Sequence, residues 1–196
     1  MEGGAAVYSA LAESTLFFRP CASEDIPVVA EIEGNSYPAD EAASPENLAY
    51  RQANAGDFFI VGIQTGTSPT EAGGDELVSY VCGTLTTADV LTHESMSTHE
   101  PEGKTLCIHS VVTEGGHRRK QIGTRTLRAY MQWVVNNTPE VEKVLLLCKK
   151  HLIGFYEGAG FRVVGPSAVE HGADQWYEMA QKTAFARAVG TMRDDD

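Results

Sequence analysis

Residues 104–133, KTLCIHSVVTEGGHRRKQIGTRTLRAYMQW, decide the fold. The segment 106–112 is a short run of apolar and β-branched residues, which predicts a buried strand. From Ile122 onwards, apolar residues recur at the spacing of one helix face, namely Leu127, Tyr130, Met131 and Val134. A polar turn with two glycines and three consecutive basic residues lies between these segments. The stretch therefore predicts a strand, a basic turn and a helix.

This unit suits phosphate binding. A helix start presents unpaired backbone N–H groups and the positive end of the helix dipole, and the preceding turn can orient further donors. Arg118, Arg119 and Lys120 raise the local positive potential in a chain that is otherwise acidic. An ordinary solvated turn has the same composition, so both interpretations stay open on these residues alone.

Length and charge restrict the possible classes of protein. The chain has 196 residues and no Pro/Ser-rich linker, which predicts one domain at 15–182 between a flexible leader (1–14) and a tail (183–196). A net charge of −12 argues against nucleic acid or an anionic membrane as a partner and favours a cationic substrate. The sequence contains neither a membrane-length apolar run nor a secretory signal, so we expect a cytoplasmic monomer.

Neither the cysteines nor the histidines indicate a metal site. Cys21, Cys82, Cys107 and Cys148 lack the C-x-x-C spacing of zinc sites and redox pairs, and we expect buried, reduced thiols. His93 and His99 lie in a polar segment without further ligands.

The rest of the chain alternates between strand and helix patterns. Further strands are predicted at 15–19, 57–63, 76–85, 141–148, 161–164 and 175–180. Helices are predicted after a Ser23 cap, at 45–55 after a Ser44 cap, and around 152–156. We expect loops at 37–43 and 64–75, the latter mobile, and a polar segment at 88–103 that includes a short helix. The fold class is α/β (α+β), with a mixed sheet of about seven strands and about four helices.

Several segments together resemble a known family. The basic turn, the strand VLLLC (144–148) and the block HLIGFYEGAGFRVVG (151–165) resemble the Gcn5-related N-acetyltransferase (GNAT) superfamily across residues 15–180. YPADEAAS (37–44), LTHES (91–95), IHSVV (108–112) and GFYEGAGF (154–161) resemble its arylalkylamine (serotonin) N-acetyltransferase branch. The resemblance implies a GNAT-type, mostly antiparallel sheet and acetyl-CoA as cosubstrate.

The resemblance also implies a cofactor site. The phosphate-binding turn of the superfamily, [RQ]-x-x-G-x-[GA], falls on residues 118–123, where Gln121 replaces the first glycine. That replacement puts the usual positive φ at Gln121 in question and leaves Gly123 for the closest backbone approach. Val111 and Thr113 should pair with the pantetheine amides. The implied cofactor-binding residues are Val111, Val112, Thr113, Arg118, Arg119, Lys120, Gln121, Ile122, Gly123, Thr124 and Phe155.

Two residues match catalytic positions of related enzymes. His109 matches one of two histidines that take the amine proton through water, and Tyr156 matches the tyrosine that donates a proton to the CoA sulfur. The second histidine position holds Cys107, so the proton route should use His109, water and an acid such as Glu33. On the residues alone, a core histidine and a core aromatic are the alternatives. Ser110 should face the opposite side of the strand from His109.

The acceptor should lie under the loop 37–44. Tyr37 and Pro38 supply an apolar wall, Asp40 and Glu41 a negative rim, and Leu147 lines the same pocket. The expected function is acetyl transfer to a small arylalkylamine by direct attack in a ternary complex, because no Cys/His pair indicates a covalent route. Alternatives are a polyamine or protein N-acetyltransferase and, from another class, a catalytically weak CoA-binding module.

Overall fold

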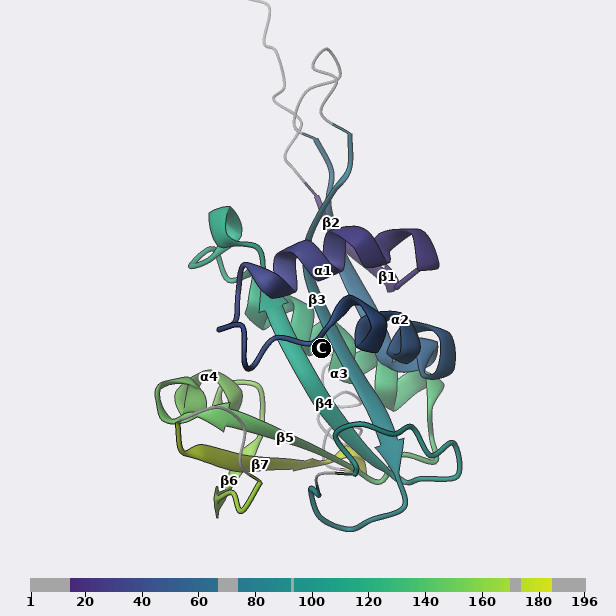
Figure 1. The fold of residues 1–196 in the computed structure, drawn as a ribbon, viewed down its shortest axis with the longest axis vertical. Helices are drawn as coiled ribbons and strands as arrows, with labels where there is room; N and C mark the ends of the chain where they lie inside the picture. Colours follow the sequence, from purple (N-terminus) through teal and green to yellow (C-terminus); the bar gives the residue numbers. More distant parts are fainter. Residues whose placement is uncertain (1–14, 67–73, 93, 170–173, 185–196) are drawn as a thin grey trace, which may run out of the picture.

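A single mixed sheet organises the protein (Figure 1). The computed structural model describes residues 15–66, 74–92, 94–169 and 174–184. In these residues seven strands lie in the order β1-β2-β3-β4-β5-β7-β6. The strands are β1 (Leu16–Pro20), β2 (Phe59–Gln64), β3 (Glu76–Thr86), β4 (Thr105–Thr113), β5 (Lys143–Lys149), β6 (Arg162–Pro166) and β7 (Trp176–Lys182). The helices are α1 (Ile26–Gly34), α2 (Pro45–Asn54), α3 (Ile122–Asn137) and α4 (Ile153–Glu157). The predicted fold class is confirmed.

The sheet splits between β4 and β5. All other neighbouring strands pair antiparallel, whereas β4 and β5 run parallel. Their pairing covers only Thr105–Ile108 and Lys143–Leu146. Beyond these residues the two strands diverge, as Figure 1 shows. The fork exposes the edges of residues 109–113 and 147–149 to whatever occupies the opening.

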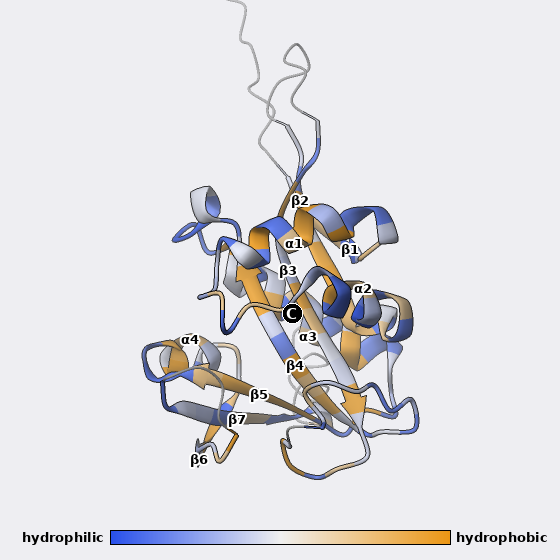
Figure 2. Ribbon diagram, viewed as in Figure 1, coloured by the Kyte–Doolittle hydropathy of each residue, from blue (hydrophilic) through white to orange (hydrophobic). Residues whose placement is uncertain are grey.

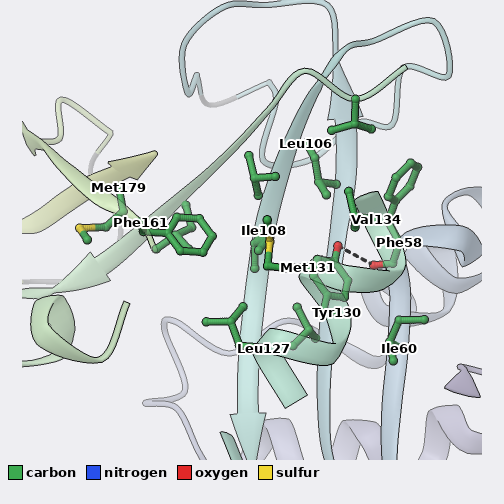
Figure 3. Close-up of a cluster of buried hydrophobic side chains, with 14 of the residues drawn as sticks. Phe58, Ile60, Leu106, Ile108, Leu127, Tyr130, Met131, Val134, Phe161 and Met179 are labelled. Carbon is green, nitrogen blue, oxygen red and sulfur yellow. Dashed lines mark hydrogen bonds between the residues drawn. The ribbon is translucent and has the colours of Figure 1, made fainter. Parts of the chain in front are cut away.

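Helices cover both faces of the sheet, and each face has its own apolar cluster. On one face, the stripe of α3 that was predicted from its spacing packs against β2, β3 and β4 (Figure 3). There the Tyr130 hydroxyl donates to the Phe58 carbonyl oxygen at 3.1 Å. On the other face, Val29, Ile32 and Leu48 of α1 and α2 pack against alternate residues of β2 and β3 and against Val112 of β4. Figure 2 shows the apolar character of the central strands.

The two predicted helix caps have different outcomes. Ser44 caps α2, because its hydroxyl accepts from the Asn47 N–H at 3.2 Å. The Ser23 cap is wrong. A 3₁₀ turn at Ser23–Asp25 precedes α1, and the Asp25 carboxylate accepts from the Ala22 N–H at 2.7 Å. Arg19 also binds this carboxylate at 2.6 Å, so an ion pair organises the turn and Asp25 is the better acceptor.

Other differences from the expected elements are small. A 3₁₀ turn at Gly56–Phe58 delays the start of β2 to Phe59. The described part of 88–103 contains turns and no helix. Thr183, directly after β7, is buried and donates to the Val141 carbonyl oxygen at 2.6 Å. The leader 1–14, the loop residues 67–73, His93 and residues 185–196 lie outside the described residues.

Two further sequence expectations concern thiols and membranes. All four cysteines are free and buried, as predicted. Within the described ranges, no helix combines the length and the apolar character that crossing a membrane requires.

Candidate active site

A cavity of about 250 Å³ lies at the fork between β4 and β5. Its walls come from the end of α1 and the following loop, from both strands of the fork, from α4 and from β7. The lining residues include Glu33, Tyr37, Pro38, Glu41, His109, Ser110, Val111, Leu147, Cys148, Lys149, Tyr156 and Trp176. The predicted residues His109, Tyr156, Tyr37, Pro38, Glu41, Val111 and Leu147 are therefore brought together around one cavity.

A β-bulge in β4 places two consecutive residues on this cavity. Ser110 is paired with Cys82 and Ile108 with Gly83, so His109 is the extra residue between them. The bulge interrupts the alternation of a regular strand, and both His109 and Ser110 line the cavity. The expectation that Ser110 faces the opposite side is wrong for this reason.

His109 is held as a neutral ring with a defined tautomer. The Thr84 hydroxyl donates to the Ser95 carbonyl oxygen at 3.4 Å, and its oxygen lies 2.7 Å from His109 Nε2, so we assign the ring N–H to Nε2. His109 Nδ1 then keeps its lone pair, and it is buried without a hydrogen-bond partner among the described residues. Loss of hydration, with a smaller contribution from Arg51, lowers the pKa of His109 well below its usual value. The ring can accept a proton at Nδ1, although it is a weak base.

Glu33 forms a buried network behind the cavity. Its side chain accepts from the Tyr80 hydroxyl, from the Ser110 hydroxyl at 3.2 Å and from the Ala43 N–H at 2.9 Å. The residue is 1% exposed. These bonds tie α1 to β3, to β4 and to the loop that follows α1. From the sequence, Glu33 was only one of several possible acids, because a sequence reveals neither the burial of a side chain nor its partners.

Tyr156 lines the cavity and keeps its hydroxyl protonated. The side chain is buried, and its ring meets those of Phe155 and Phe161 edge-on. Burial, and secondarily the neighbouring Cys148, raises the pKa of Tyr156 far above its ordinary value. The phenol therefore keeps its proton and acts as a hydrogen-bond donor.

The basic turn has the left-handed backbone that was in question. Gln121 has φ 61° and Arg119 has φ 64°, both in the region that favours glycine. Gln121 thus adopts the positive φ despite its side chain. At Gly123, an added Cβ would lie 3.1 Å from Thr113 Oγ1, so the start of α3 closely approaches the end of β4. Arg119, Lys120 and Gln121 are exposed at this turn.

The other residues of the expected cofactor site contact groups within the protein. The Arg118 guanidinium donates to the Thr113 carbonyl oxygen at 3.1 Å and to the Ser36 hydroxyl at 2.9 Å. Loss of hydration raises the pKa of the Tyr37 hydroxyl, which lies near the backbone of Val111. Val112 points into the core beside Tyr80, and Phe155 packs near Gly123.

The acceptor loop is tied to β5 by an ion pair. Lys149 Nζ lies 2.8 Å from Glu41 Oε1 and 3.0 Å from Asp174 Oδ2. Asp40, which was grouped with Glu41, is exposed and does not line the cavity. Lys149 was not predicted as a site residue from the sequence. Lys149 follows Leu147 by two residues on a strand, so both side chains are expected on the same face.

Cys107 lies away from this chemistry. It is fully buried beside Leu91 and Leu145 and does not line the cavity. Burial raises the pKa of its thiol to about 11. A protonated, enclosed thiol is not a base. Within the described ranges, no group of three or more His, Cys, Asp or Glu side chains is arranged to hold a metal ion.

The fold and the fork agree with a family assignment made from sequence. The pattern of the acetyltransferase (GNAT) family matches residues 26–161. The chain belongs to this family.

Individual relatives add detail. Serotonin N-acetyltransferase of Mesocricetus auratus is 33% identical over 103 residues, which are 53% of this chain and 49% of that protein. The chain thus spans about half the length of the curated relatives it matches. The GphF GNAT-like decarboxylase in complex with isobutyryl-CoA is 15% identical and has a TM-score of 0.69, over 85% of this chain and 99% of that chain. Arabidopsis thaliana NAA60 in complex with acetyl-CoA is 16% identical with a TM-score of 0.64, over 86% of this chain and 98% of that chain. These two structures show the shared fold.

Proposed function

We propose that this protein transfers the acetyl group of acetyl-CoA to the primary amine of a small arylalkylamine, by direct attack in a ternary complex. The observation that carries the proposal is the cavity at the β4–β5 fork, which His109, Val111 and Tyr156 line together. Membership of the acetyltransferase family supports the reaction class. Similarity to serotonin N-acetyltransferases supports the acceptor class.

The residues around the fork fit acetyl-CoA. The first N–H groups of α3 lack partners within the helix and point toward the turn, where the exposed Arg119 and Lys120 add positive charge. Gly123 has no side chain and lies close to Thr113, so at this point the start of α3 presents its backbone. Arg119 to Thr124 would hold the phosphates, and Val111 and Thr113 would hold the pantetheine arm. When bound, acetyl-CoA supplies the acetyl group as a thioester.

His109 accepts the proton that the amine must lose. The amine of an arylalkylamine arrives mostly protonated, with a pKa near that of Lys, and only the neutral form attacks a carbonyl. Nδ1 is the acceptor atom, because Nε2 is hydrogen-bonded to the Thr84 hydroxyl. Since the lowered pKa of His109 makes it a weak base, it relays the proton through water toward solvent rather than storing it.

Tyr156 stabilises the sulfur of CoA as it leaves. Its raised pKa makes full proton transfer to a thiolate unfavourable, because a thiol with a pKa of about 8.5 is the stronger acid. The hydroxyl instead donates a hydrogen bond to the developing negative charge on sulfur. The free thiol then forms with the second proton that the amine nitrogen loses, as the C–S bond breaks and the amide forms, whereas the first proton has left through His109 and water.

The acceptor fits under the loop after α1. Tyr37, Pro38 and Leu147 supply apolar surface, and Glu41 supplies a carboxylate on the same cavity. An aromatic ring with a short alkylamine arm matches a partly apolar cavity of about 250 Å³. The exposed Asp40 has no part in this proposal.

The test is release of CoA thiol from acetyl-CoA with tryptamine, serotonin, phenylethylamine, spermidine and a peptide with a free N-terminus. We expect the largest kcat/KM with the arylalkylamines. A strong preference for spermidine or for the peptide would move the acceptor to the polyamine or protein class. Binding of acetyl-CoA without turnover of any amine would favour a CoA-binding module.

A further inference from the structure

The cavity contains a cation site that the protein fills with its own lysine. Lys149 Nζ on β5 lies 2.8 Å from Glu41 of the loop after α1 and 3.0 Å from Asp174 before β7. It also lies 5.4 Å from the centre of the Trp176 ring on β7. Two carboxylates and an aromatic face are the groups that recognise ammonium ligands in proteins.

Burial makes a cation necessary at this place. The side chain of Glu41 is only 4% exposed, and that of Lys149 is 21% exposed, whereas Asp174 is 65% exposed. A carboxylate this deeply buried is unfavourable unless a positive group compensates it. Hydrogen bonds to Glu41 and then to Asp174 raise the pKa of Lys149, so its ammonium keeps its charge.

The position of this site relates it to the acceptor. Glu41, Lys149 and Trp176 line the same cavity as His109 and Tyr156. An acceptor with one amine near His109 and a second ammonium further along would reach this site. There it would find Glu41 already neutralised and would meet the like charge of Lys149, which opposes binding.

We propose that Lys149 determines acceptor specificity by occupying the cavity's ammonium site, so that the protein accepts monoamines and rejects diamines. The inference rests on the proposed acetyl transfer and deepens it, because it names the acceptor class. If Lys149 has this role, the net negative charge of the chain does not draw polyamines into this cavity. An ion pair that only holds the loop in place would leave the choice between monoamines and diamines unchanged.

The test compares matched acceptors in matched variants. Lys149→Met keeps the length and apolar stem of the side chain and removes its charge. Lys150→Met is the control, since Lys150 is the next residue, is exposed and does not line the cavity. For each protein the ratio of kcat/KM for a linear α,ω-diamine to that for the n-alkylamine of equal length is measured over a series of chain lengths. The ratio is independent of the fraction of protein that is folded.

We expect Lys149→Met to raise this ratio about tenfold or more for at least one chain length, the effect of one charge-assisted hydrogen bond. Lys150→Met should leave the ratio unchanged. Adding Glu41→Gln to Lys149→Met should remove the gain, and Lys149→Arg should keep the wild-type ratio. We also expect the diamine to bind Lys149→Met and raise its Tm, whereas the monoamine should leave the Tm unchanged.

The outcomes separate two failures. An unchanged ratio in Lys149→Met, with a wild type that acetylates tryptamine, overturns the role of Lys149 and leaves the proposed function standing. A wild type that prefers diamines overturns the role of Lys149 and also moves the acceptor to the polyamine class. A wild type that acetylates neither of these acceptors, nor tryptamine measured beside them, overturns the proposed function. In that case equal Tm shifts with diamine and monoamine for Lys149→Met would also overturn the cation site.

Discussion

At the scale of single residues, burial decides the protonation state of His109. The folded-state pKa lies well below the usual value of about 6.5, which the unfolded chain retains. Below pH 6.5 the unfolded chain therefore binds a proton that the folded chain does not, and the stability contributed by the neutral ring is lost as pH falls.

We therefore expect His109→Gln to flatten the loss of stability on the acid side. Wild type should lose up to about 1.4 kcal/mol per pH unit more than the variant below about pH 6.5. Above that pH the difference in free energy of unfolding should be constant. Urea unfolding of both proteins between pH 5 and 8 measures this. Parallel curves over the whole range would show that the ring is not held neutral.

Tyr156 is a hydrogen-bond donor at a place where charge develops. We expect Tyr156→Phe to lower kcat by about tenfold to a hundredfold, with little change in KM for acetyl-CoA. Tyr177→Phe, on β7 and outside the cavity lining, is the matched control. Steady-state kinetics at saturating amine distinguishes the two. An unchanged kcat in Tyr156→Phe would show that Tyr156 only packs in the core and takes no part in the reaction.

Gln121 adopts a backbone conformation that suits glycine better. Its φ of 61° is strained for a residue with a Cβ, so Gln121→Gly should relieve strain and raise the free energy of unfolding by about 0.5 kcal/mol. Lys120→Gly, at a position without positive φ, should lower it by about 0.5–1 kcal/mol. Equal losses in both variants in denaturant unfolding would contradict the left-handed turn.

At the scale of elements, Glu33 connects α1, β4 and the acceptor loop. We expect Glu33→Gln to destabilise the protein by about 1–3 kcal/mol, because an amide cannot accept from all of Tyr80, Ser110 and the Ala43 N–H. The loop should also loosen, so KM for the amine should rise more than KM for acetyl-CoA. The exposed Glu31→Gln on the same helix is the control and should stay within about 0.5 kcal/mol of wild type.

Local patterns predicted most elements because their signals are local. The spacing of apolar residues placed the start of α3 at Ile122, and the Ser44-Pro45 pair placed α2. The features that sequence did not predict depend on distant partners. Arg19 brings Asp25 into the turn before α1, and the pairing of β3 with β4 creates the bulge that turns Ser110 toward the cavity.

In the candidate site, too, the sequence did not predict features that depend on distant partners. The positions of His109 and Tyr156 followed from the resemblance, and both line the cavity. The Lys149–Glu41 pair joins residues that are 108 apart in sequence, so no local pattern indicated it. The burial of Cys107 was predicted, but its packing beside Leu91 and Leu145 depends on the tertiary fold.

At the scale of the whole molecule, the fork concentrates chemistry that the sequence distributes over its length. Pairing between β4 and β5 ends at Ile108 and Leu146, and the cavity opens beyond these two residues. The chain is acidic overall, with a net charge of −12, yet the turn before α3 is basic. An anionic cosubstrate is therefore attracted to one part of a molecule that repels anions elsewhere.

The central claim is that the fork is an acetyl-transfer site, and a crystal structure with acetyl-CoA and tryptamine tests it most directly. We predict phosphates at residues 119–124, the pantetheine arm along Val111 and Thr113, and the amine within reach of His109 Nδ1 directly or through one water. The acetyl carbonyl should lie between the amine and the Tyr156 hydroxyl. Density for acetyl-CoA outside the fork, or for tryptamine outside the cavity lined by His109 and Tyr156, would contradict the account.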